Sequence, residues 1–435
     1  MKSSNPSGVS RRTLTKVGIF GFAASPLLAA CGNESGGGGG EGDGELDVWW
    51  WGSEPRHAYT QEILDAFKAE NDDVTLKPSP ADFSGYWDAL NISVSGGNAP
   101  DVMQQDERYL RDYADKNALI ALDDLDIDLS QIEEDTLKSG QLEGKTYGIA
   151  TGVNALCLLV NPALVEAAGM EMPDDTTWTW ADFAQFTTDL SAGGDAIGNS
   201  GLSFNNESLF NVFARQRGES LFTEDGQLGF TEATMNEWWQ MVIDLREAGA
   251  ISAADKIVES VAAGQDQAPL ATGTGVTEFY WTNQIGAIQT VLGSDLVLLR
   301  VPGESEGSPG MFLKSAMYWS IARDTSDQAA AAKLVDYLLN SDEAIDLTLG
   351  DRGLPSNLAQ RERILPDMPA DQKLGADFVA AITPELAAGP PVPPIGAGGV
   401  ADIMLGIYEA LLFDQATVEE TTAAFIEQTN SAIGA

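Results

Sequence analysis

The sequence predicts an α/β protein built from two lobes, and three observations support this prediction. The chain has 435 residues, which is more than one ordinary doubly wound domain needs. Apolar residues make up 43% of it and charged residues 21%, as in globular proteins and unlike disordered acidic ones. Short strand-like apolar runs alternate with segments of helical periodicity, a pattern typical of parallel sheets covered by helices on both faces.

The alternation is clearest just after the N-terminal region. Leu46 to Trp51 is apolar and aromatic apart from one acid, and a Gly-Ser-Glu-Pro sequence breaks this strand. The next segment places Ile63, Leu64 and Phe67 at helical spacing. In order, the predicted elements of this part are strand 46–51, helix 60–71, strand 74–76, helix 86–94 and strand 101–104.

The same pattern continues to the C-terminus without an internal repeat. A proline-rich segment, 389–394, precedes the last two helices. The further predicted strands are 146–150, 155–160, 296–301 and 318–322, and the further helices are 180–190, 207–217, 231–248, 326–339, 401–413 and 417–432.

The N-terminus reads as an export signal. Residues 1–30 hold four bases and no acid, and Ser10 to Lys16 resembles a twin-arginine motif. The apolar stretch 17–30 has 14 residues, the length of a signal-peptide core and too short for a bilayer span. Leu-Ala-Ala-Cys at 28–31 resembles a lipobox. We therefore expect a twin-arginine lipoprotein signal peptide at 1–30, then lipidated Cys31 and a flexible glycine-rich tether through 31–44.

Charge and composition exclude several classes of partner and site. The chain has 66 acids and 24 bases, a formal charge of −42, and removal of the signal would leave 20 bases and −46. Nucleic acid needs a clustered basic surface, so it is not an expected partner. The single histidine, His57, leaves no His-rich metal site. With Cys31 lipidated, Cys157 has no partner for a disulfide and is expected to be a small buried residue.

No motif for a cofactor, a metal or a nucleophile stands out. The glycine-rich stretches at 36–40 and 273–275 lack the lysine of a phosphate loop, and there is no Gly-x-Ser-x-Gly elbow. The acidic segment 123–128 lacks the central glycine and distal glutamate of a calcium loop, so a solvated loop is its default interpretation. We expect no cofactor, no metal and no catalytic residue.

Aromatic residues gather where strands end and loops begin, for example at 49–51, 178–180, 280–283 and 318–320. In parallel α/β sheets, ligands bind beyond the carboxyl ends of the strands. Flat rings at such places suit the apolar faces of sugar rings. The alternative for any one ring is packing in the core, and this holds most strongly for Trp50, which alternates with its neighbours.

Several segments, in the same order along nearly 400 residues, resemble the family 1 extracellular solute-binding proteins of carbohydrate ABC transporters, which include the maltose-binding proteins. The segments that carry this resemblance are 50–53 (WWGS), 85–87 (GYW), 96–103 (GGNAPDVM), 144–149 (GKTYGI), 154–162, 178–183 (WTWADF), 352–356 (RGLPS) and the amphipathic tail 416–433.

The resemblance implies a periplasmic-binding-protein-like fold, with two lobes connected by a hinge and ligand in the cleft between them. The first lobe would comprise 44–152 and 303–348, and the second 153–302 and 349–435. Closure would be a hinge motion that creates the surface read by the permease. The implied partners are a carbohydrate and the permease subunits, and the protein is expected to be a monomer on the outer face of the cell membrane.

The resemblance also implies ligand contacts, carried over position by position. Asn154 stands where the maltose binder has an acid, so maltose specificity does not transfer. Arg352 and Trp319 are weaker assignments than the others. The predicted ligand-binding residues are Trp51, Ser53, Glu54, Trp87, Gln105, Asp106, Asn154, Tyr280, Trp281, Trp319 and Arg352.

The leading hypothesis is a non-enzymatic, lipid-anchored carbohydrate receptor that feeds an ABC importer. A secreted glycoside hydrolase is one alternative, and it would need two suitably spaced carboxylates. A receptor for another solute, such as glycerol phosphate, is a second alternative. A phosphate ligand would need two or more bases converging in the cleft, and the available ones are Arg56, Arg108, Arg215, Arg217 and Arg352.

Overall fold

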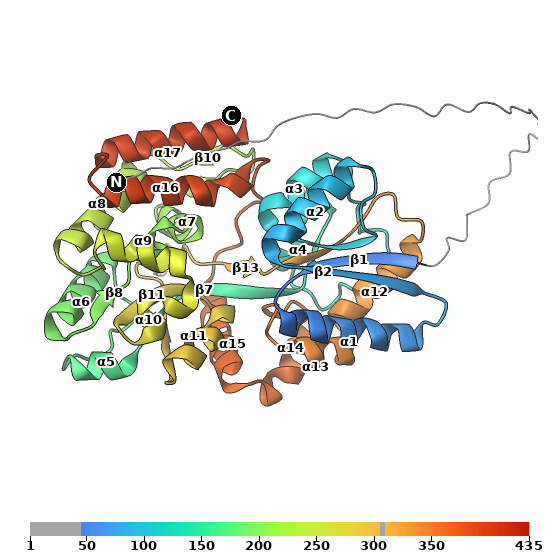
Figure 1. The fold of residues 1–435 in the computed structure, drawn as a ribbon, viewed down its shortest axis with the longest axis horizontal. Coiled ribbons are helices and arrows are strands. Elements are labelled where there is room, and N and C mark those ends of the chain that lie inside the picture. The colour runs from blue at the N-terminus through green and yellow to red at the C-terminus, as the bar shows by residue number, and fades with distance from the viewer. Residues whose placement is uncertain (1–44, 305–308, 435) are drawn as a thin grey trace, which may run out of the picture. The chain divides into compact units, whose positions relative to one another are not determined.

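The structure is a computed structural model that describes residues 45–304 and 309–434 (Figure 1). The predicted signal peptide, Cys31 and the whole of the tether lie outside the described residues. Two main sheets organise the described part: one of five strands and one of six. We call each sheet, with the helices that pack on it, a lobe. The lobe boundaries predicted from the sequence stay a prediction.

The first part of the chain forms β1 (Glu45–Trp51), α1 (Glu54–Glu70), β2 (Thr75–Ala81), α2 (Phe83–Ser95), β3 (Val102–Gln105), α3 (Glu107–Asp115), α4 (Glu134–Lys138), β4 (Gln141–Leu142), β5 (Lys145–Thr146), β6 (Ile149–Ala150), β7 (Gly152–Val160), α5 (Pro162–Ala167), α6 (Trp180–Gly193), β8 (Ile197–Asn199), η1 (Leu202–Asn205), α7 (Glu207–Arg215), β9 (Ser220–Phe222), β10 (Leu228–Gly229) and α8 (Glu232–Glu247). It continues with α9 (Ala254–Ala263), η2 (Gln265–Gln267), α10 (Pro269–Thr272), β11 (Gly275–Trp281), η3 (Thr282–Gln284), α11 (Ile285–Leu292), β12 (Val297–Leu299), β13 (Leu313–Ser315), β14 (Tyr318–Ile321), α12 (Gln328–Asn340), α13 (Asp342–Thr348), β15 (Leu354–Pro355), α14 (Leu358–Ile364), η4 (Leu365–Asp367), α15 (Ala370–Ile382), η5 (Thr383–Glu385), η6 (Ala397–Gly399), α16 (Val400–Leu412) and α17 (Val418–Ile433).

The first sheet has the strand order β2-β1-β3-β14-β6. β1 pairs in parallel with β2 and with β3, whereas β14 runs antiparallel to β3 and to β6. The carboxyl ends of β1 and β3 therefore meet at one edge, where Trp51 and Gln105 end their strands.

Period-two alternation sorts the first tryptophans onto opposite faces of this sheet. Trp50 is fully buried with Leu46 and Val48 in a cluster that also contains residues of α1 and α12. Trp51 faces the other way, into a cluster with Tyr86 and Trp87 of α2. The prediction that Trp50 belongs to the core is confirmed.

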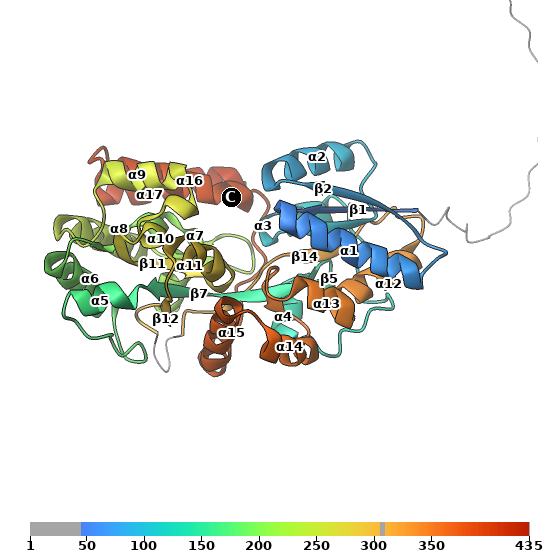
Figure 2. The same ribbon diagram turned by 60° about the horizontal axis from the view of Figure 1, so that its bottom comes forward.

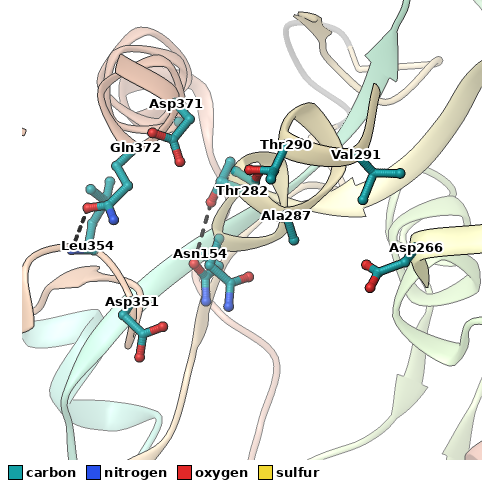
Figure 3. Close-up of a pocket in the computed structure, with 14 residues that line it drawn as sticks. Asn154, Asp266, Thr282, Ala287, Thr290, Val291, Asp351, Leu354, Asp371 and Gln372 are labelled. Carbon is teal, nitrogen blue, oxygen red and sulfur yellow. Dashed lines mark hydrogen bonds between the residues drawn. The ribbon is translucent and has the colours of Figure 1, made fainter. Parts of the chain in front are cut away.

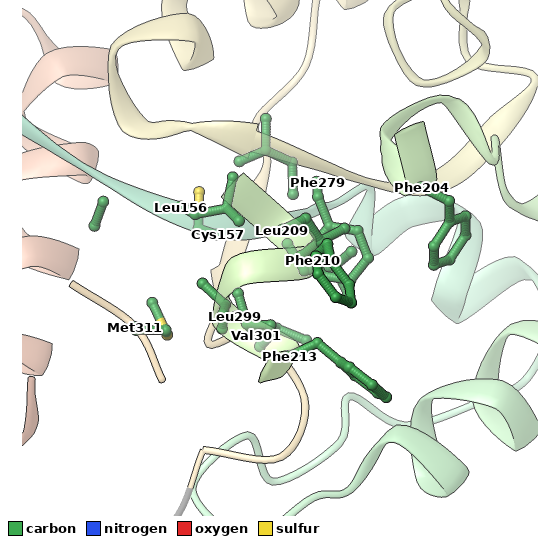
Figure 4. Close-up of a cluster of buried hydrophobic side chains, with 14 of the residues drawn as sticks. Leu156, Cys157, Phe204, Leu209, Phe210, Phe213, Phe279, Leu299, Val301 and Met311 are labelled. Atoms are coloured by element: carbon green, nitrogen blue, oxygen red, sulfur yellow. The ribbon is translucent and has the colours of Figure 1, made fainter. Parts of the chain in front are cut away.

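The second sheet has the order β12-β7-β11-β8, and β13 and β15 also pair with β7. All nine residues of β7 are buried, as the unbroken apolar character of most of this strand suggests. Its second half packs in the largest cluster of buried apolar side chains, with Cys157 beside Leu156 and near Phe279 (Figure 4). Cys157 is a free, buried cysteine, as expected.

The two sheets are joined through short segments of chain. Only Thr151 separates β6 of the first sheet from β7 of the second, and Ala316 and Met317 lie between β13 and β14. Figure 2 shows β7 running between the two groups of helices. Because few residues connect the sheets here, these segments are suited to act as hinges.

Most predicted elements are confirmed within a few residues, and two are longer than predicted. α1 begins at Glu54, because Pro55 lies in its first turn, where a missing N–H is tolerated. The Gly-Ser-Glu-Pro sequence therefore both ends the strand and begins the helix. β2 continues to Ala81 through Pro78 and Pro80. β2 is an edge strand, where proline does not remove a needed hydrogen bond.

Two kinds of feature are absent from the described residues. No helix in this part of the chain has the length and apolar character of a membrane span. No group of His, Cys, Asp and Glu side chains in it has the arrangement of a metal site. In the acidic segment 123–128, Asp123 instead accepts hydrogen bonds from Thr146, at 2.9 Å from both its amide nitrogen and its hydroxyl.

Candidate functional site

A polar cavity of about 450 Å³, within the size range of small-molecule sites, lies where the chain passes from the first sheet into β7 (Figure 3). Its walls come from β7, from η3 and α11, from α15, and from the loop that follows α13. We call it the cleft cavity. It is lined by Asn154, Asp266, Thr282, Asn283, Gly286, Ala287, Thr290, Val291, Gly350, Asp351, Leu354, Asp371, Gln372 and Gly375.

Asn154 is the predicted ligand-binding residue that lines this cavity. It lies on β7, with 5% of its surface exposed. Its Oδ1 accepts a hydrogen bond of 3.5 Å from the Thr282 hydroxyl. Its Nδ2 donates no hydrogen bond to any residue in the described ranges. An amide whose donor opens onto a cavity wall is equipped to bind a polar ligand group, because that donor can hydrogen-bond an acceptor that enters the cavity.

The loop after α13 is fixed to α1 by charge. Arg56 Nε donates to Asp351 Oδ2 at 2.7 Å, and the Tyr59 hydroxyl donates to the same oxygen at 2.6 Å. Burial opposes ionisation of Asp351, but Arg56 and these hydrogen bonds hold its pKa below the ordinary value. The carboxylate at this end of the cavity is therefore ionised and already has a partner.

The end of β3 supplies a second polar group at the carboxyl edge of the first sheet. Gln105 is fully buried, and neither polar atom of its side chain has a hydrogen-bond partner in the described structure. Asp106 caps α3 by accepting from the Arg108 amide at 3.0 Å, and it pairs with the Arg108 side chain at 2.9 Å. Burial alone would raise the pKa of Asp106, but Arg108 and Lys314 lower it.

Lys314 links two of the predicted positions, Asn154 and Trp281, to Glu107 at the start of α3. It lies on β13 directly opposite Asn154 of β7 in the antiparallel register. Its ammonium group is 3.0 Å from the Glu107 carboxylate and 5.7 Å from the centre of the Trp281 ring. The structure thus connects the end of β3, the crossing strand and the aromatic end of β11.

Trp51 and Trp87 belong to an aromatic cluster at the same edge of the first sheet. Their ring centres are 5.4 Å apart, and the Trp87 ring is 4.2 Å from that of Tyr109. Both tryptophans are nearly buried, whereas Phe83 is 42% exposed and lies 5.6 Å from Trp51. Phe83 is therefore the member of this cluster that presents most of its ring to solvent.

The other predicted positions lie apart from the cleft cavity. Ser53 and Glu54 are exposed at the start of α1, and Tyr280 is half-buried on β11. Arg352 is 4% exposed, 5.3 Å from the centre of the buried Trp319 ring, and donates to Thr60 Oγ1 at 2.8 Å. In this structure Arg352 and Trp319 make packing contacts; a ligand role for any of these residues stays a prediction.

The cavity also contains residues that the sequence did not single out. Asn283 is a partial exception, because it ends the segment 280–283 in which the sequence places aromatic residues at a loop. Asp371 and Gln372 lie on α15, far along the chain from any motif, and reach the site through packing of α15 on α11. No sequence signal pointed to them.

Comparison with known proteins identifies the family of this chain. A model of the bacterial extracellular solute-binding protein family matches residues 62–375, well over half of the chain. The chain belongs to this family. Members of the family bind solutes outside the cytoplasm, so this is an extracytoplasmic solute-binding protein.

Named relatives of the solute-binding protein are distant. A putative binding protein of Brucella abortus is 23% identical over 364 residues, which cover 81% of this chain and 84% of the relative. A family 1 extracellular solute-binding protein from Alicyclobacillus acidocaldarius is 24% identical, with a TM-score of 0.72 over 90% of this chain and 98% of that one. A periplasmic oligogalacturonide binding protein from Yersinia enterocolitica is 21% identical, with a TM-score of 0.75 over 90% and 99%.

These structural matches establish the two-lobe fold of periplasmic solute-binding proteins, as the sequence predicted. Structures described as de novo designed esterases share the fold at 20% identity, with TM-scores of 0.75 and 0.76. The fold alone therefore does not decide between binding and catalysis, and the site has to do so.

Proposed function

We propose that this solute-binding protein captures a sugar or oligosaccharide and delivers it to the permease of an ABC importer, without performing chemistry on it. The observation that carries the proposal is the cleft cavity, whose walls offer amides, hydroxyls and carboxylates. Sugar hydroxyls both donate and accept hydrogen bonds, so they suit such a wall. The Yersinia relative, which binds oligogalacturonide, supports a carbohydrate ligand.

A sugar would use the polar groups of the cavity together with aromatic rings outside its lining. Asn154 offers an amide donor that bonds no described residue, and Trp281 and Phe83 present partly exposed rings, one in each lobe. A sugar held between them would bury apolar ring faces against these side chains and satisfy the amide. Closure about the short connections near Thr151 would then complete the contacts.

Binding is tested by thermal shift and tryptophan fluorescence of the full chain against neutral and charged mono- and oligosaccharides. A ligand at 100 times its dissociation constant should stabilise the protein by about 2.7 kcal/mol. Asn154→Ala should weaken this effect, whereas Asn98→Ala, at an exposed asparagine outside the cavity, should not. Failure of every sugar and polyol to shift melting or emission would overturn the proposal.

A phosphate-bearing ligand has less support, because the bases available for it are engaged within the protein. Arg56 pairs with Asp351, Arg108 with Asp106, and Arg217 with Glu237. Arg215 donates to two backbone carbonyl oxygens, and Arg352 is buried beside Thr60. None of the residues lining the cleft cavity is basic.

A glycoside hydrolase would use two of the cavity carboxylates. Release of reducing sugar by the purified protein from the oligosaccharides that bind to it would favour this function over the receptor. Stable binding without release of product is the result expected for a receptor.

We also propose that the protein is a monomer, exported through a twin-arginine signal and anchored by a lipid on Cys31. The motifs at residues 10–16 and 28–31, which lie outside the described residues, support the export route and the lipid anchor. Mass spectrometry of the membrane form should find a lipid-modified Cys31 at the new N-terminus. Cys31→Ala should release the protein from the membrane fraction, and changing Arg11 and Arg12 to Lys should stop export.

A further inference from the structure

We propose that the cleft cavity prefers sugars that carry a positively charged amino group and discriminates against sugars that carry carboxylates. The proposal rests on the proposed carbohydrate-binding function and adds the chemical class of ligand. Its basis is the charge of the side chains around the cavity, together with a buried amide that faces the same space.

Asp371 is the central residue of this proposal. It lies on α15 at the cavity wall and is half-buried. Its carboxylate makes no ion pair and no hydrogen bond with any other described residue. A Cβ atom at position 286 would collide with this carboxylate, so Gly286 of α11 leaves the room that the acid occupies. The carboxylate oxygens of Asp371 therefore lie at the cavity wall and can accept hydrogen bonds from a ligand.

Two other carboxylates border the same space. Asp266 of η2 faces the cavity from the side away from Asp371, and it also lacks a partner among the described residues (Figure 3). Asp351 is the third, and Arg56 already pairs with it at 2.7 Å. Two of the three carboxylates, those of Asp371 and Asp266, therefore form no ion pair with a basic side chain of the described ranges.

The basic residues around the cleft are engaged within the protein. Arg56 pairs with Asp351, and the buried Arg352 donates to Thr60 Oγ1 at 2.8 Å. Lys314 is committed to Glu107 at 3.0 Å, and Arg108 to Asp106 at 2.9 Å. A sugar carboxylate entering the cavity would meet like charge and would have to break one of these pairs to find a cation. An ammonium group would instead gain a charge-assisted hydrogen bond, the stronger kind of polar contact.

Asn154 shows that this is a built site and more than a group of surface acids. Its side chain is 95% buried, reaches the same cavity and keeps a free amide donor. The donor suits a neutral hydroxyl oxygen next to the amino group. A ligand with both hydroxyl and ammonium groups therefore satisfies Asn154 and Asp371 together.

The test uses matched sugars and the full chain. β-1,4-linked tetramers of glucose, glucosamine and glucuronate differ in charge and share ring stereochemistry, and a galactose, galactosamine and galacturonate set covers the other common epimer. In isothermal titration at pH 6.5 we expect the amino tetramer of one set to bind roughly tenfold more tightly than its neutral counterpart. We expect the uronate tetramer to bind more weakly than both.

Two variants of α15 locate the effect. Asp371→Asn should remove most of the amino-sugar advantage and leave the affinity for the neutral tetramer nearly unchanged. Asp377→Asn is the matched control. This acid is exposed on the same helix, does not line the cavity, and forms no ion pair with a described residue. It should change neither affinity.

The outcomes separate this proposal from the one on which it rests. Equal or tighter binding of neutral or uronate tetramers overturns the amino-sugar preference and leaves the carbohydrate receptor intact. An amino-sugar advantage that survives in Asp371→Asn overturns the role of that carboxylate. If no member of either set binds, and the wider sugar screen is also negative, both proposals fail.

Discussion

Lys314 of β13 and Glu107 of α3 form an ion pair of 3.0 Å that joins a strand of the second sheet to a helix of the first. Both side chains are mostly buried, with exposures of 18% and 22%. An ion pair in such a place contributes little net free energy, yet removal of one partner leaves the other charge poorly solvated.

Lys314→Met should therefore lower the free energy of unfolding by about 1–3 kcal/mol, less than for a fully buried pair, because Glu107 keeps some contact with water. Chemical denaturation measures this change. Lys256→Met is the control, since its pair with Glu259 is exposed on both sides and such pairs contribute about 0–1 kcal/mol. Equal losses in the two variants would contradict the interpretation.

A second connection between lobes runs through the proline-rich segment. Arg111 of α3 donates to the backbone oxygens of Pro393 and Val392, at 3.1 and 3.2 Å, and Val392 packs in the aromatic cluster of the first sheet. This segment leads into α16 of the other lobe.

Arg111→Met should loosen this attachment, since hydrogen bonds to charged groups contribute about 1.5–3 kcal/mol. We expect faster proteolysis within 389–395 and a lower melting temperature. Arg323→Met, at an exposed arginine without a hydrogen bond from its side chain among the described residues, should leave both unchanged. Unaltered cleavage in Arg111→Met would show that the segment is held by packing alone.

Phe83 and Trp51 should respond differently to truncation, although their rings are 5.6 Å apart. Phe83 is 42% exposed, so Phe83→Ala should cost little stability and weaken sugar binding by roughly tenfold, or about 1.4 kcal/mol. Trp51 is 6% exposed, and Trp51→Ala should destabilise the fold by about 3–5 kcal/mol. Calorimetry with and without sugar separates the two effects. Unchanged affinity in Phe83→Ala would exclude that ring as a contact.

The sequence was informative about elements whose patterns are local. β1 shows strict alternation, and α17 has the Thr-x-x-Glu capping box that the structure contains at Thr417 and Glu420. Both were located within one or two residues. The sequence predicts neither α3 nor α15. Asp106, which caps α3, also suits the end of the preceding strand, and no motif marks the segment that forms α15.

The cleft cavity was less predictable, for a physical reason. Asn154 was found through its motif on the crossing strand. Asp371 and Gln372 enter the site because α15 packs on α11, and that contact depends on the tertiary arrangement of segments some 80 residues apart. The exposure of Phe83 relative to Trp51 also depends on the whole aromatic cluster. Neither the packing of α15 on α11 nor the relative exposure of these two rings can be read from a short sequence pattern.

Two buried glutamates predict how stability depends on pH. Glu278 is fully buried on β11, and its carboxylate accepts hydrogen bonds from the Leu202 and Phe279 amides at 2.9 Å. Glu304 is nearly buried and accepts from the Gly310 and Met311 amides. In both residues burial raises the pKa, although these hydrogen bonds oppose the shift. The folded protein therefore binds protons at higher pH than the unfolded chain does.

Stability should consequently rise as pH falls from 7.5 to about 5, because each raised carboxyl pKa makes the folded state bind more protons than the unfolded one. Below about pH 4 the trend should reverse. The pKa values of Asp106 and Asp351 are lowered in the folded protein, so the unfolded chain takes up protons on these two carboxylates first. The stability that comes from their ion pairs with Arg108 and Arg56 is therefore lost as the pH falls further.

Melting curves in high salt test this, because salt screens the repulsion among surface acids and leaves buried groups much less affected. Glu278→Gln should flatten the rise between pH 7.5 and 5, whatever its effect on absolute stability. Glu247→Gln, at an exposed position on α8, should keep the rise intact. A melting temperature that stays constant or drops over this interval in high salt would mean that the buried glutamates titrate at ordinary pKa values, so that the acid-side stability of the protein depends on its surface charge.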